Sequence, residues 1–365
     1  MNKNKRVAVA MSGGVDSSVC AALLQKKGYD VFGMTMHFEL AYPQAGRASC
    51  GNASAVTDAK NIAKSLGIPH KVVDISRALR EKVIKDFCRQ YLSGNTPNPC
   101  VRCNELIKFG VFFDQALAFG ADYVSTGHYA RLAQSSRYGL VLKKAKDLKK
   151  DQSYFLYRVP TDVLSRVIFP LGNYTKSQVR KLASDFKLPV ADKPDSQEIC
   201  FLPRTDYREF LKKYAHARVK PGRVIDAVGN ILGEHLGAAF YTIGQRGGLG
   251  IAMGHPAYVT RIDCRRNTVT LGAREAACSR EFLIKDICGE IACLKKKVAL
   301  KVKIRYNHKE MPAELARAGK KIKAVFTIPQ FAVTPGQSAV FYDKDIVLGG
   351  GIIEKVYYSH DEKNA

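Results

Sequence analysis

Residues 11–20, MSGGVDSSVC, constrain the fold more than any other segment of this chain. They follow a short apolar run at 6–11, which predicts a buried strand, and they lead into a stretch at 18–27 whose apolar residues have helical spacing. Adjacent glycines let the backbone approach a ligand closely, and the N–H groups at the start of a helix favour an anion. The segment therefore predicts a phosphate-binding turn between a strand and a helix.

Two common phosphate-binding patterns are missing from this turn. No Lys-Ser or Lys-Thr pair follows the glycines, so the GxxxxGK[ST] loop of nucleotide hydrolases is excluded. GxGxxG is also absent here, which disfavours a dinucleotide fold. An ordinary tight turn is the remaining alternative, but the combination SGG-x-DS in this context favours a phosphate guest.

The N-terminal part of the chain predicts alternating strands and helices. Strands fit the apolar runs at 30–38 and 70–75, and helices fit 54–66 and 78–92. This alternation is typical of an α/β fold with a doubly wound parallel sheet. Ligands of such sheets bind at the carboxyl ends of the strands, which is where the SGG-x-DS turn is expected.

The pattern changes near residue 210. We interpret 211–223 as a basic linker, and the short apolar runs that follow predict β-hairpins and then a small β-barrel. A period of two would place Lys301, Lys303 and Arg305 on one face of a strand. The expected domains are an α/β catalytic domain at 1–210, a small β-containing middle domain at 211–275, and a C-terminal barrel at 276–365.

The charge balance points to a polyanionic partner. The chain has 58 Lys and Arg against 33 Asp and Glu, a formal net charge of +25. Solvated basic faces are the alternative, but an excess of this size favours nucleic acid. No run of about 18 apolar residues exists, and the first apolar stretch is too short for a signal peptide, so we expect a cytoplasmic protein that does not bind a membrane.

The ten cysteines divide into core residues and candidate reactive thiols. A chain without an export signal is not expected to be a disulfide scaffold, and Cys20 and Cys88 lie in helical patterns that predict burial. Cys100 and Cys103 follow a Pro- and Asn-rich loop and open a helix, where the helix start and Arg102 would lower a thiol pKa.

A lone CxxC pair leaves a redox pair, half of a metal site, or chance as interpretations, and no second CxxC supports zinc. Cys200 lies in a Pro- and Asp-rich loop that follows a predicted helix with Thr175 as its N-cap. A cysteine in such a loop is more plausibly reactive than buried.

The turn at 12–17 resembles the pyrophosphate loop of the ATP pyrophosphatases, which split ATP between the α and β phosphates and adenylate an oxygen of the substrate. The resemblance implies that this loop grips the departing pyrophosphate and that Asp16 lies near Mg²⁺. The implied ATP-binding residues are Ala10, Met11, Ser12, Gly13, Gly14, Val15, Asp16, Ser17, Met36 and Gly127.

Seven segments in order resemble the tRNA-specific 2-thiouridylases and cover nearly the whole chain. They are TPNPCVRCNELIKFG (96–110), STGHYAR (125–131), KKDQSYFLY (149–157), DSQEICFLP (195–203), YTIGQRGGLGI (241–251), KIRY (303–306) and TPGQSAVFY (334–342). The resemblance implies that ATP adenylates the 2-oxygen of the wobble uridine of tRNA and that a persulfide sulfur then displaces AMP.

The same resemblance implies roles for individual residues. Cys200 would carry the persulfide received from a sulfur-relay protein, and Cys103 would free the sulfur and form a transient disulfide with Cys200. Asn98, Pro99 and Cys100 would touch the flipped target base. The implied tRNA contacts are His128, Lys150, Asp151, Gln152, Arg305, Tyr306 and Gln337.

Cys100 departs from the family pattern, in which many members have an aspartate at this position. With Cys103 and Cys200 it could supply three thiolates to a [4Fe–4S] cluster with one open iron, which could bind incoming sulfide. The sequence leaves the persulfide and the cluster routes open.

Two other functions compete with tRNA thiolation. A small-molecule amidating synthetase would keep the adenylation, but it would need an ammonia source and leaves the basic domains unexplained. A non-catalytic RNA-binding protein would have no use for the SGG-x-DS turn together with Cys103 and Cys200. ATP splitting that requires tRNA is expected only of a tRNA-thiolating enzyme.

Overall fold

The computed structural model describes residues 5–39, 53–191, 193–194, 199–202, 207–215, 219–251 and 253–358. The chain forms two compact units, which are described separately. The first unit comprises Met1–Ile84, Pro99–Thr205 and Asp345–Val347, and the second comprises Lys85–Asn98, Asp206–Lys344 and Leu348–Ala365.

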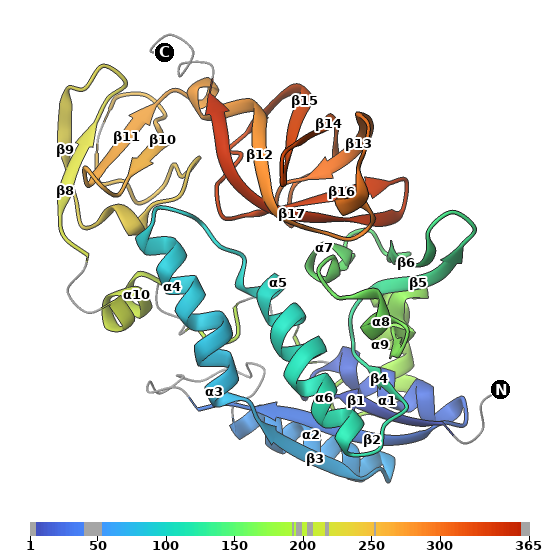
Figure 1. The fold of residues 1–365 in the computed structure, drawn as a ribbon. Coiled ribbons are helices and arrows are strands. Elements are labelled where there is room, and N and C mark those ends of the chain that lie inside the picture. The colour runs from blue at the N-terminus through green and yellow to red at the C-terminus, as the bar shows by residue number, and fades with distance from the viewer. Residues whose placement is uncertain are drawn as a thin grey trace. The chain divides into compact units, whose positions relative to one another are not determined.

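A parallel five-stranded sheet organises the first unit, and it confirms the predicted α/β fold class. Its strand order is β3-β2-β1-β4-β7 (Figure 1). Every neighbouring pair is parallel. The strands are β1 (Arg6–Ala10), β2 (Asp30–His37), β3 (His70–Asp74), β4 (Tyr123–Ser125) and β7 (Val167–Ile168).

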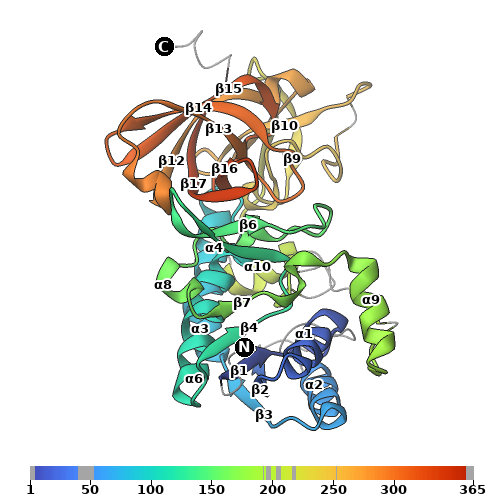
Figure 2. The same cartoon turned by 90° about the vertical axis from the view of Figure 1, so that its right-hand side faces the viewer.

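The helices of this unit cover both faces of the sheet. Helices α1 (Val15–Lys26) and α2 (Ala53–Leu66) lie on one side, and α6 (Phe112–Ala118) lies on the other (Figure 2). Right-handed crossovers explain the arrangement, because the chain moves outward from β1 to β3 and then returns to β4 in the opposite direction. The order therefore reverses between β1 and β4, and this switch point is where such sheets bind ligands.

The remaining elements of the first unit are short. They are α3 (Ser76–Leu79), η1 (Arg80–Ile84), α5 (Pro99–Cys103), η2 (Asn104–Val111), β5 (Ala130–Ser135), β6 (Gly139–Lys144), α7 (Ser153–Leu156), α8 (Thr161–Leu164), η3 (Pro170–Asn173) and α9 (Lys176–Asp185). The helix predicted at 78–92 is divided into α3, the π-helical turn η1, and α4 (Lys85–Leu92). The predicted N-cap holds, since Thr175 accepts from the backbone N–H of Gln178 in a capping box.

Helices α4 and α10 pack together in the second unit. One prediction for this region was wrong. Residues 211–215 are not linker but the end of α10 (Tyr207–Ala215). Phe210 and Leu211 are buried, and Phe210 packs edge-on against Phe87 of α4 with ring centroids 6.1 Å apart. The basic residues of 211–223 suggested solvent exposure, but this apolar pair gives the segment a face to bury.

Two β-structures complete the second unit. A four-stranded sheet of order β10-β11-β8-β9 contains both predicted hairpins, β8–β9 and β10–β11. Six further strands close into the predicted barrel, because β12 pairs with both β15 and β17. The strands are β8 (Gly222–Ile225), β9 (Ile231–His235), β10 (Tyr258–Asp263), β11 (Thr268–Gly272), β12 (Cys278–Cys288), β13 (Val298–Lys303), β14 (Met311–Ala318), β15 (Lys321–Phe331), β16 (Ser338–Asp343) and β17 (Ile346–Tyr358). The single-turn helices η4 (Ala238–Phe240), η5 (Arg274–Ala277) and η6 (Glu290–Cys293) connect them.

The strand that was expected to carry three basic residues ends early. Strand β13 stops at Lys303, so Arg305 lies outside it and does not share a strand face with Lys301. The barrel core is apolar, with Phe282, Phe326 and Phe341 fully buried. Within the part of the chain that the structure describes, we find no helix with the length and apolarity needed to span a bilayer.

Candidate active site

The turn at 12–17 has the geometry of an anion-binding loop. Gly13 has φ +68°, and a Cβ at this position would lie 2.8 Å from the Cβ of Asp58 and 2.9 Å from a carbonyl oxygen of α2, so only glycine fits. Ser17 Oγ donates to the carbonyl of Gly14 at 3.1 Å and accepts from the N–H of Ser12 at 3.2 Å. Among the described residues, no side chain caps the start of α1, which leaves its first N–H groups directed at the loop.

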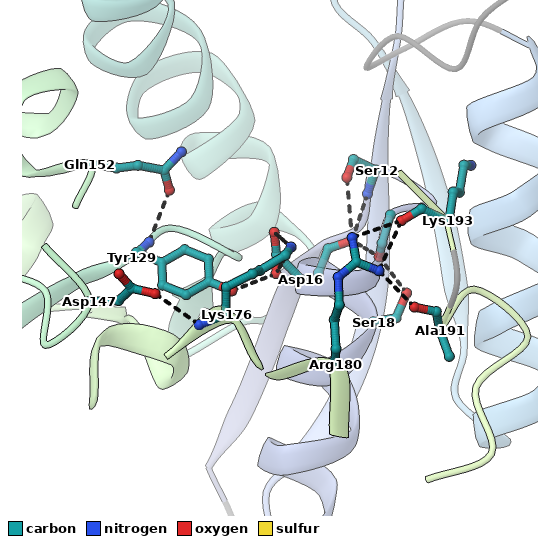
Figure 3. Close-up of polar contacts among 12 residues, drawn as sticks. Ser12, Asp16, Ser18, Tyr129, Asp147, Gln152, Lys176, Arg180, Ala191 and Lys193 are labelled. Atoms are coloured by element: carbon teal, nitrogen blue, oxygen red, sulfur yellow. Dashed lines mark hydrogen bonds and ion pairs between the residues drawn. The ribbon is translucent and has the colours of Figure 1, made fainter. Parts of the chain in front are cut away.

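Asp16 is held by two side chains from distant parts of the sequence. Lys176 Nζ lies 2.8 and 2.9 Å from the two carboxylate oxygens, and the hydroxyl of Tyr129 donates to Oδ1 at 2.8 Å (Figure 3). The Lys176 side chain is only 13% exposed, so its ion pair with Asp16 is poorly screened by solvent. The loop therefore carries a fixed cation next to its only carboxylate.

A second cation contacts the loop at Gly13. Lys193 Nζ donates to the carbonyl of Gly13 at 2.9 Å and to Asp58 Oδ2 at 2.6 Å. Arg180 of α9 donates to the carbonyls of Ala191 at 2.9 Å and Lys193 at 3.4 Å, which fixes the segment that bears Lys193. Figure 3 shows Lys176 beside Asp16 and Arg180 beside Ala191 and Lys193, and both side chains belong to α9. Helix α9 thus equips the phosphate loop with positive charge.

Sequence patterns did not point to four residues of this site, which are Lys176, Lys193, Arg180 and Tyr129. One signal could have found Lys176, because it is the first residue of α9. A cation at that end opposes the positive end of the helix dipole, where acidic residues are favoured. A lysine in this unfavourable place indicates that its charge is used by another part of the molecule, here by Asp16.

The other two predicted ATP-binding positions lie at the carboxyl edge of the same sheet. Met36 is near the end of β2, and Gly127 follows β4 across the switch point from the loop. A Cβ at Gly127 would lie 3.0 Å from the N–H nitrogen of Ser17, so a larger residue would crowd the start of α1. The topology therefore gathers all the predicted ATP-binding residues at one edge of the sheet.

A polar chain links this edge to the loop backbone. The Thr35 hydroxyl donates to the carbonyl of Met11 at 2.8 Å, and it lies 2.8 Å from His70 Nε2. Because the hydroxyl has one proton, it accepts from His70, whose Nε2 carries the hydrogen. Burial, aided by Lys60, lowers the pKa of His70 and keeps this ring neutral. The carbonyl of Met11 is thereby fixed just before the phosphate loop.

The three candidate thiols lie in the first unit. Cys100 and Cys103 are on α5, Cys200 follows in the loop after α9, and each is half-buried. Four residues of the motif before Cys200, at 195–198, lie outside the described residues. The described cysteines are all thiols. Cys20 and Cys88 are buried as predicted, and burial raises the pKa of Cys88 to about 11, so it is no nucleophile at neutral pH.

Charged groups next to the CxxC helix form a compact cluster. Glu105 Oε2 accepts from Arg102 at 2.7 Å and from Arg158 at 2.8 Å. Two guanidinium groups around one carboxylate give this cluster a net positive charge, and Arg102 keeps a third of its side chain exposed. Asn104, which is 3% exposed, donates to the carbonyl of Phe155 at 3.2 Å and ties this helix to α7.

The four predicted tRNA-binding residues of the first unit differ in how deeply they are buried. His128 is 8% exposed, its Nδ1 lies 2.8 Å from Thr126 Oγ1, and burial, aided by Lys108, lowers its pKa well below the usual value. Asp151 is also buried and accepts from Ala145 and Ser153. Gln152 and Lys150 are half-buried, and Gln152 Oε1 accepts from the N–H of Tyr129 at 3.0 Å.

The predicted tRNA contacts of the second unit also make internal contacts. Arg305 donates to the carbonyls of Phe331 at 2.9 Å and Ala332 at 2.5 Å. Gln337 Nε2 donates to the carbonyl of Thr96 at 2.8 Å. Tyr306 is half-buried, and Lys303 Nζ lies 5.4 Å from its ring centroid.

A glycine-rich loop and two lysines at the switch point of a parallel sheet define a nucleotide-binding α/β protein. Three family models match the chain: the tRNA methyl transferase HUP domain over 5–204, the tRNA methyl transferase PRC-barrel domain over 208–273, and the aminomethyltransferase beta-barrel domain over 280–353.

Curated relatives define the family more narrowly. The chain is 46% identical over 363 residues to tRNA-specific 2-thiouridylase MnmA 2 of Thermoanaerobacter sp. (strain X514), with 97% of this chain and 99% of the relative covered. It is 48% identical over 361 residues to tRNA-specific 2-thiouridylase MnmA 1 of Caldanaerobacter subterraneus subsp. tengcongensis, with the same coverage. A solved U34-tRNA thiolase, NcsA from Methanococcus maripaludis, matches 58% of this chain and 67% of its own at 17% identity with a TM-score of 0.34. The chain belongs to the tRNA-specific 2-thiouridylase family.

Proposed function

We propose that this chain catalyses the ATP-dependent 2-thiolation of the wobble uridine of tRNA. The observation that carries the proposal is the arrangement around Asp16: a phosphate loop at the switch point, cationic through Lys176 and Lys193, in the same unit as Cys100, Cys103 and Cys200. Family membership supplies the substrate class, and the net charge of +25 suits a polyanion.

The first step activates the uridine. Its O2 attacks the α phosphorus of ATP, the bond between the α phosphorus and the bridging oxygen breaks, and pyrophosphate leaves. The N–H groups at the start of α1 and the ammonium groups of Lys176 and Lys193 stabilise the charge that develops on the departing pyrophosphate. The carbonyl oxygen of uridine, which is a poor leaving group, becomes part of AMP.

Asp16 fits the role of a Mg²⁺ ligand. Mg²⁺ is usually held by one or two carboxylates together with substrate phosphates, and Asp16 is the carboxylate of this loop. When bound, the ion neutralises phosphate charge. We propose that Lys176 occupies the Asp16 carboxylate in the ligand-free protein and turns to the phosphates when ATP and the ion bind.

The second step delivers sulfur. A sulfur-relay protein loads Cys200 as a persulfide, and the terminal sulfur attacks C2 of the adenylated base. The Cys103 thiolate attacks Cys200 Sγ, the S–S bond electrons pass to the transferred sulfur, and AMP leaves from C2. The products are 2-thiouridine, AMP and a Cys103–Cys200 disulfide, which a cellular dithiol reduces before the next turnover.

For the sulfur step we follow the persulfide route. Among the described residues, no three Cys, His, Asp or Glu side chains are grouped to hold a metal ion. We derive no step through a [4Fe–4S] cluster, and we assign Cys100, with Asn98 and Pro99, to the target base.

Among the predicted tRNA-binding residues, we propose direct contacts for those whose side chains are partly accessible. Lys150 and Tyr306 are half-buried and can reach a backbone phosphate or stack on a base. His128 and Asp151 are buried, so we propose that they shape the tRNA site from inside: Asp151 accepts from the N–H of Ala145 at 3.0 Å and fixes the turn that presents Lys150.

Nucleoside mass spectrometry of tRNA from cells that lack this chain tests the function. We expect loss of 2-thiouridine and its return with the wild-type chain. Complementation with Cys200→Ser should fail, while the purified variant still releases AMP in the presence of tRNA. Cys293→Ser, which changes an exposed thiol, is the matched control and should restore the nucleoside. Unchanged 2-thiouridine in the deletion strain contradicts the proposal.

A further inference from the structure

Tyr129 connects Asp16 of the phosphate loop with the KDQ segment at 150–152. Its hydroxyl donates to Asp16 Oδ1 at 2.8 Å (Figure 3). Its backbone N–H donates to Gln152 Oε1 at 3.0 Å, and its carbonyl accepts from the N–H of Gln152 at 2.9 Å. Because Tyr129 is only 3% exposed, little water competes for these hydrogen bonds. One buried residue therefore links the phosphate loop to a segment that is predicted to bind tRNA.

A second connection runs through Asp147, just before the KDQ segment. Asp147 Oδ2 accepts from the N–H of Lys176 at 3.0 Å, and Oδ1 accepts from the N–H of Lys149 at 3.1 Å (Figure 3). Lys176 is the first residue of α9, an end of the helix where a carboxylate is favoured. Asp147 thus offsets the lysine at the helix start and ties it to the chain that leads into the KDQ segment.

The turn at 145–153, which contains both connections, is held together by its own hydrogen bonds. Asp151 is buried and accepts from the N–H of Ala145 at 3.0 Å. It also accepts from the N–H of Ser153 at 3.2 Å and from the hydroxyl of Ser153 at 2.8 Å. All of these residues belong to the first unit. We expect a turn bonded in this way to move as one piece, so that its position determines both connections to the phosphate loop.

We infer that Tyr129 and Asp147 are positioning residues that couple the binding of tRNA at the KDQ segment to the binding of ATP at the phosphate loop. This inference rests on the proposed function for the identity of the two ligands. In the ligand-free protein, Lys176 and Tyr129 both hold Asp16. Once Lys176 turns to the phosphates, the hydroxyl of Tyr129 remains to orient the carboxylate.

The coupling follows from the ordering of the chain. A tRNA contact at the KDQ segment fixes Gln152, and Gln152 fixes Tyr129 through two backbone hydrogen bonds. ATP then meets a carboxylate that is already oriented, so its binding costs less conformational entropy. Linkage requires that bound ATP tighten the binding of tRNA by the same factor.

Tyr129→Phe tests the inference, because it removes the hydroxyl and keeps the buried ring. The Kd for tRNA is measured by filter binding with purified full-length protein, with and without α,β-methylene-ATP and Mg²⁺. This analogue has no oxygen between the α and β phosphorus atoms, so no AMP is released. We expect it to lower the Kd at least about fivefold in the wild type and less than about twofold in Tyr129→Phe. Without the analogue, the two proteins should bind tRNA equally within about twofold.

Asp147→Ala cuts the second connection and should also reduce the effect of the analogue to less than about twofold. Two matched controls should keep the effect of the wild type. Tyr123→Phe changes a half-buried tyrosine at the amino end of β4, and Asp162→Ala changes an exposed acid of α8.

An analogue effect in Tyr129→Phe and Asp147→Ala as large as in the wild type overturns the inference. A wild-type Kd that does not respond to the analogue also overturns it. If Tyr129→Phe weakens the binding of tRNA by one factor with and without the analogue, the residue is structural only, and the inference again fails. A wild-type chain that binds tRNA but makes no 2-thiouridine would contradict the proposed function, while these Kd values, which involve no turnover, still decide the coupling.

Discussion

The phosphate loop and the arm at 95–97 are both short segments that must be held rigidly, but they are held by different means. The loop is closed by hydrogen bonds among its own residues Ser12, Gly14 and Ser17, and a local pattern in the chain records this. The arm is held by Thr242 and Gln337, which are 146 and 241 residues away. The comparison teaches that a locally built site is visible in a sequence, whereas a remotely built one is seen only in the fold.

The largest expected effect is at the loop. Asp16→Ala removes the carboxylate that Lys176 and Tyr129 hold, and we expect the tRNA-dependent release of AMP to fall at least about 1000-fold. Radiolabelled ATP resolved by thin-layer chromatography measures it. Asp162→Ala, an exposed acid of α8, is the control and should leave the rate unchanged. AMP release within tenfold of wild type in Asp16→Ala would show that the loop does not depend on this carboxylate.

Lys176→Met removes the ammonium group that pairs with Asp16 but keeps the hydrogen bonds within the loop. The loop hydrogen bonds remain, but one cation near the departing pyrophosphate is lost, and we expect AMP release to fall about 100-fold. The Kd for pyrophosphate, measured by calorimetry without tRNA, should rise as well. Lys181→Met changes an exposed lysine of the same helix and should do neither. Equal rates for both variants would mean that the Asp16 pair is structural only.

Thr242→Val removes one hydrogen bond to Thr96, and we expect a smaller effect. It removes the acceptor for the Thr96 hydroxyl but leaves the bonds to Pro335 and Gln337, so we expect kcat for thiolation to fall by about fivefold, which corresponds to about 1 kcal/mol for one hydrogen bond. Thr260→Val, a buried threonine of β10 in the same unit, is the matched control. A loss no larger than in Thr260→Val would show that the hydrogen bond between Thr96 and Thr242 does not contribute to the rate.

The last prediction concerns His128, beside the switch point, and its effect is on stability and not on the rate of AMP release. Its folded-state pKa lies below its unfolded value of about 6.5, so the unfolded chain binds more protons as pH falls and stability declines below that pH. We expect the denaturation free energy of wild type to fall more steeply between pH 6.5 and 5 than that of His128→Asn, by up to about 1.4 kcal/mol per pH unit. Urea titrations at several pH values measure this. Parallel curves would show that His128 binds a proton equally well in the folded and the unfolded chain.

The sequence predicted the elements whose causes are local. The apolar runs of β1 and β2, the periodicity of α2 and the N-cap at Thr175 all appear where expected. The hairpins β8–β9 and β10–β11 and the barrel follow from short strands with turn residues between them.

Features with remote causes could not be predicted. The π-helical turn η1 divides one predicted helix, because apolar spacing does not distinguish an i→i+5 turn from an α-helix. Arg305 reads as part of a strand, yet it turns to the carbonyls of Phe331 and Ala332. Lys193 contacts Gly13, 180 residues away, and no local pattern reports such a partner.

Counting products in one reaction tests the central claim most directly. Purified chain, tRNA, ATP with Mg²⁺ and a persulfide donor should yield AMP and 2-thiouridine in a ratio of 1:1, measured by chromatography and nucleoside mass spectrometry in the same sample. Without tRNA, the release of AMP should fall to background. Formation of 2-thiouridine without AMP, or release of AMP at full rate without tRNA, would contradict the account.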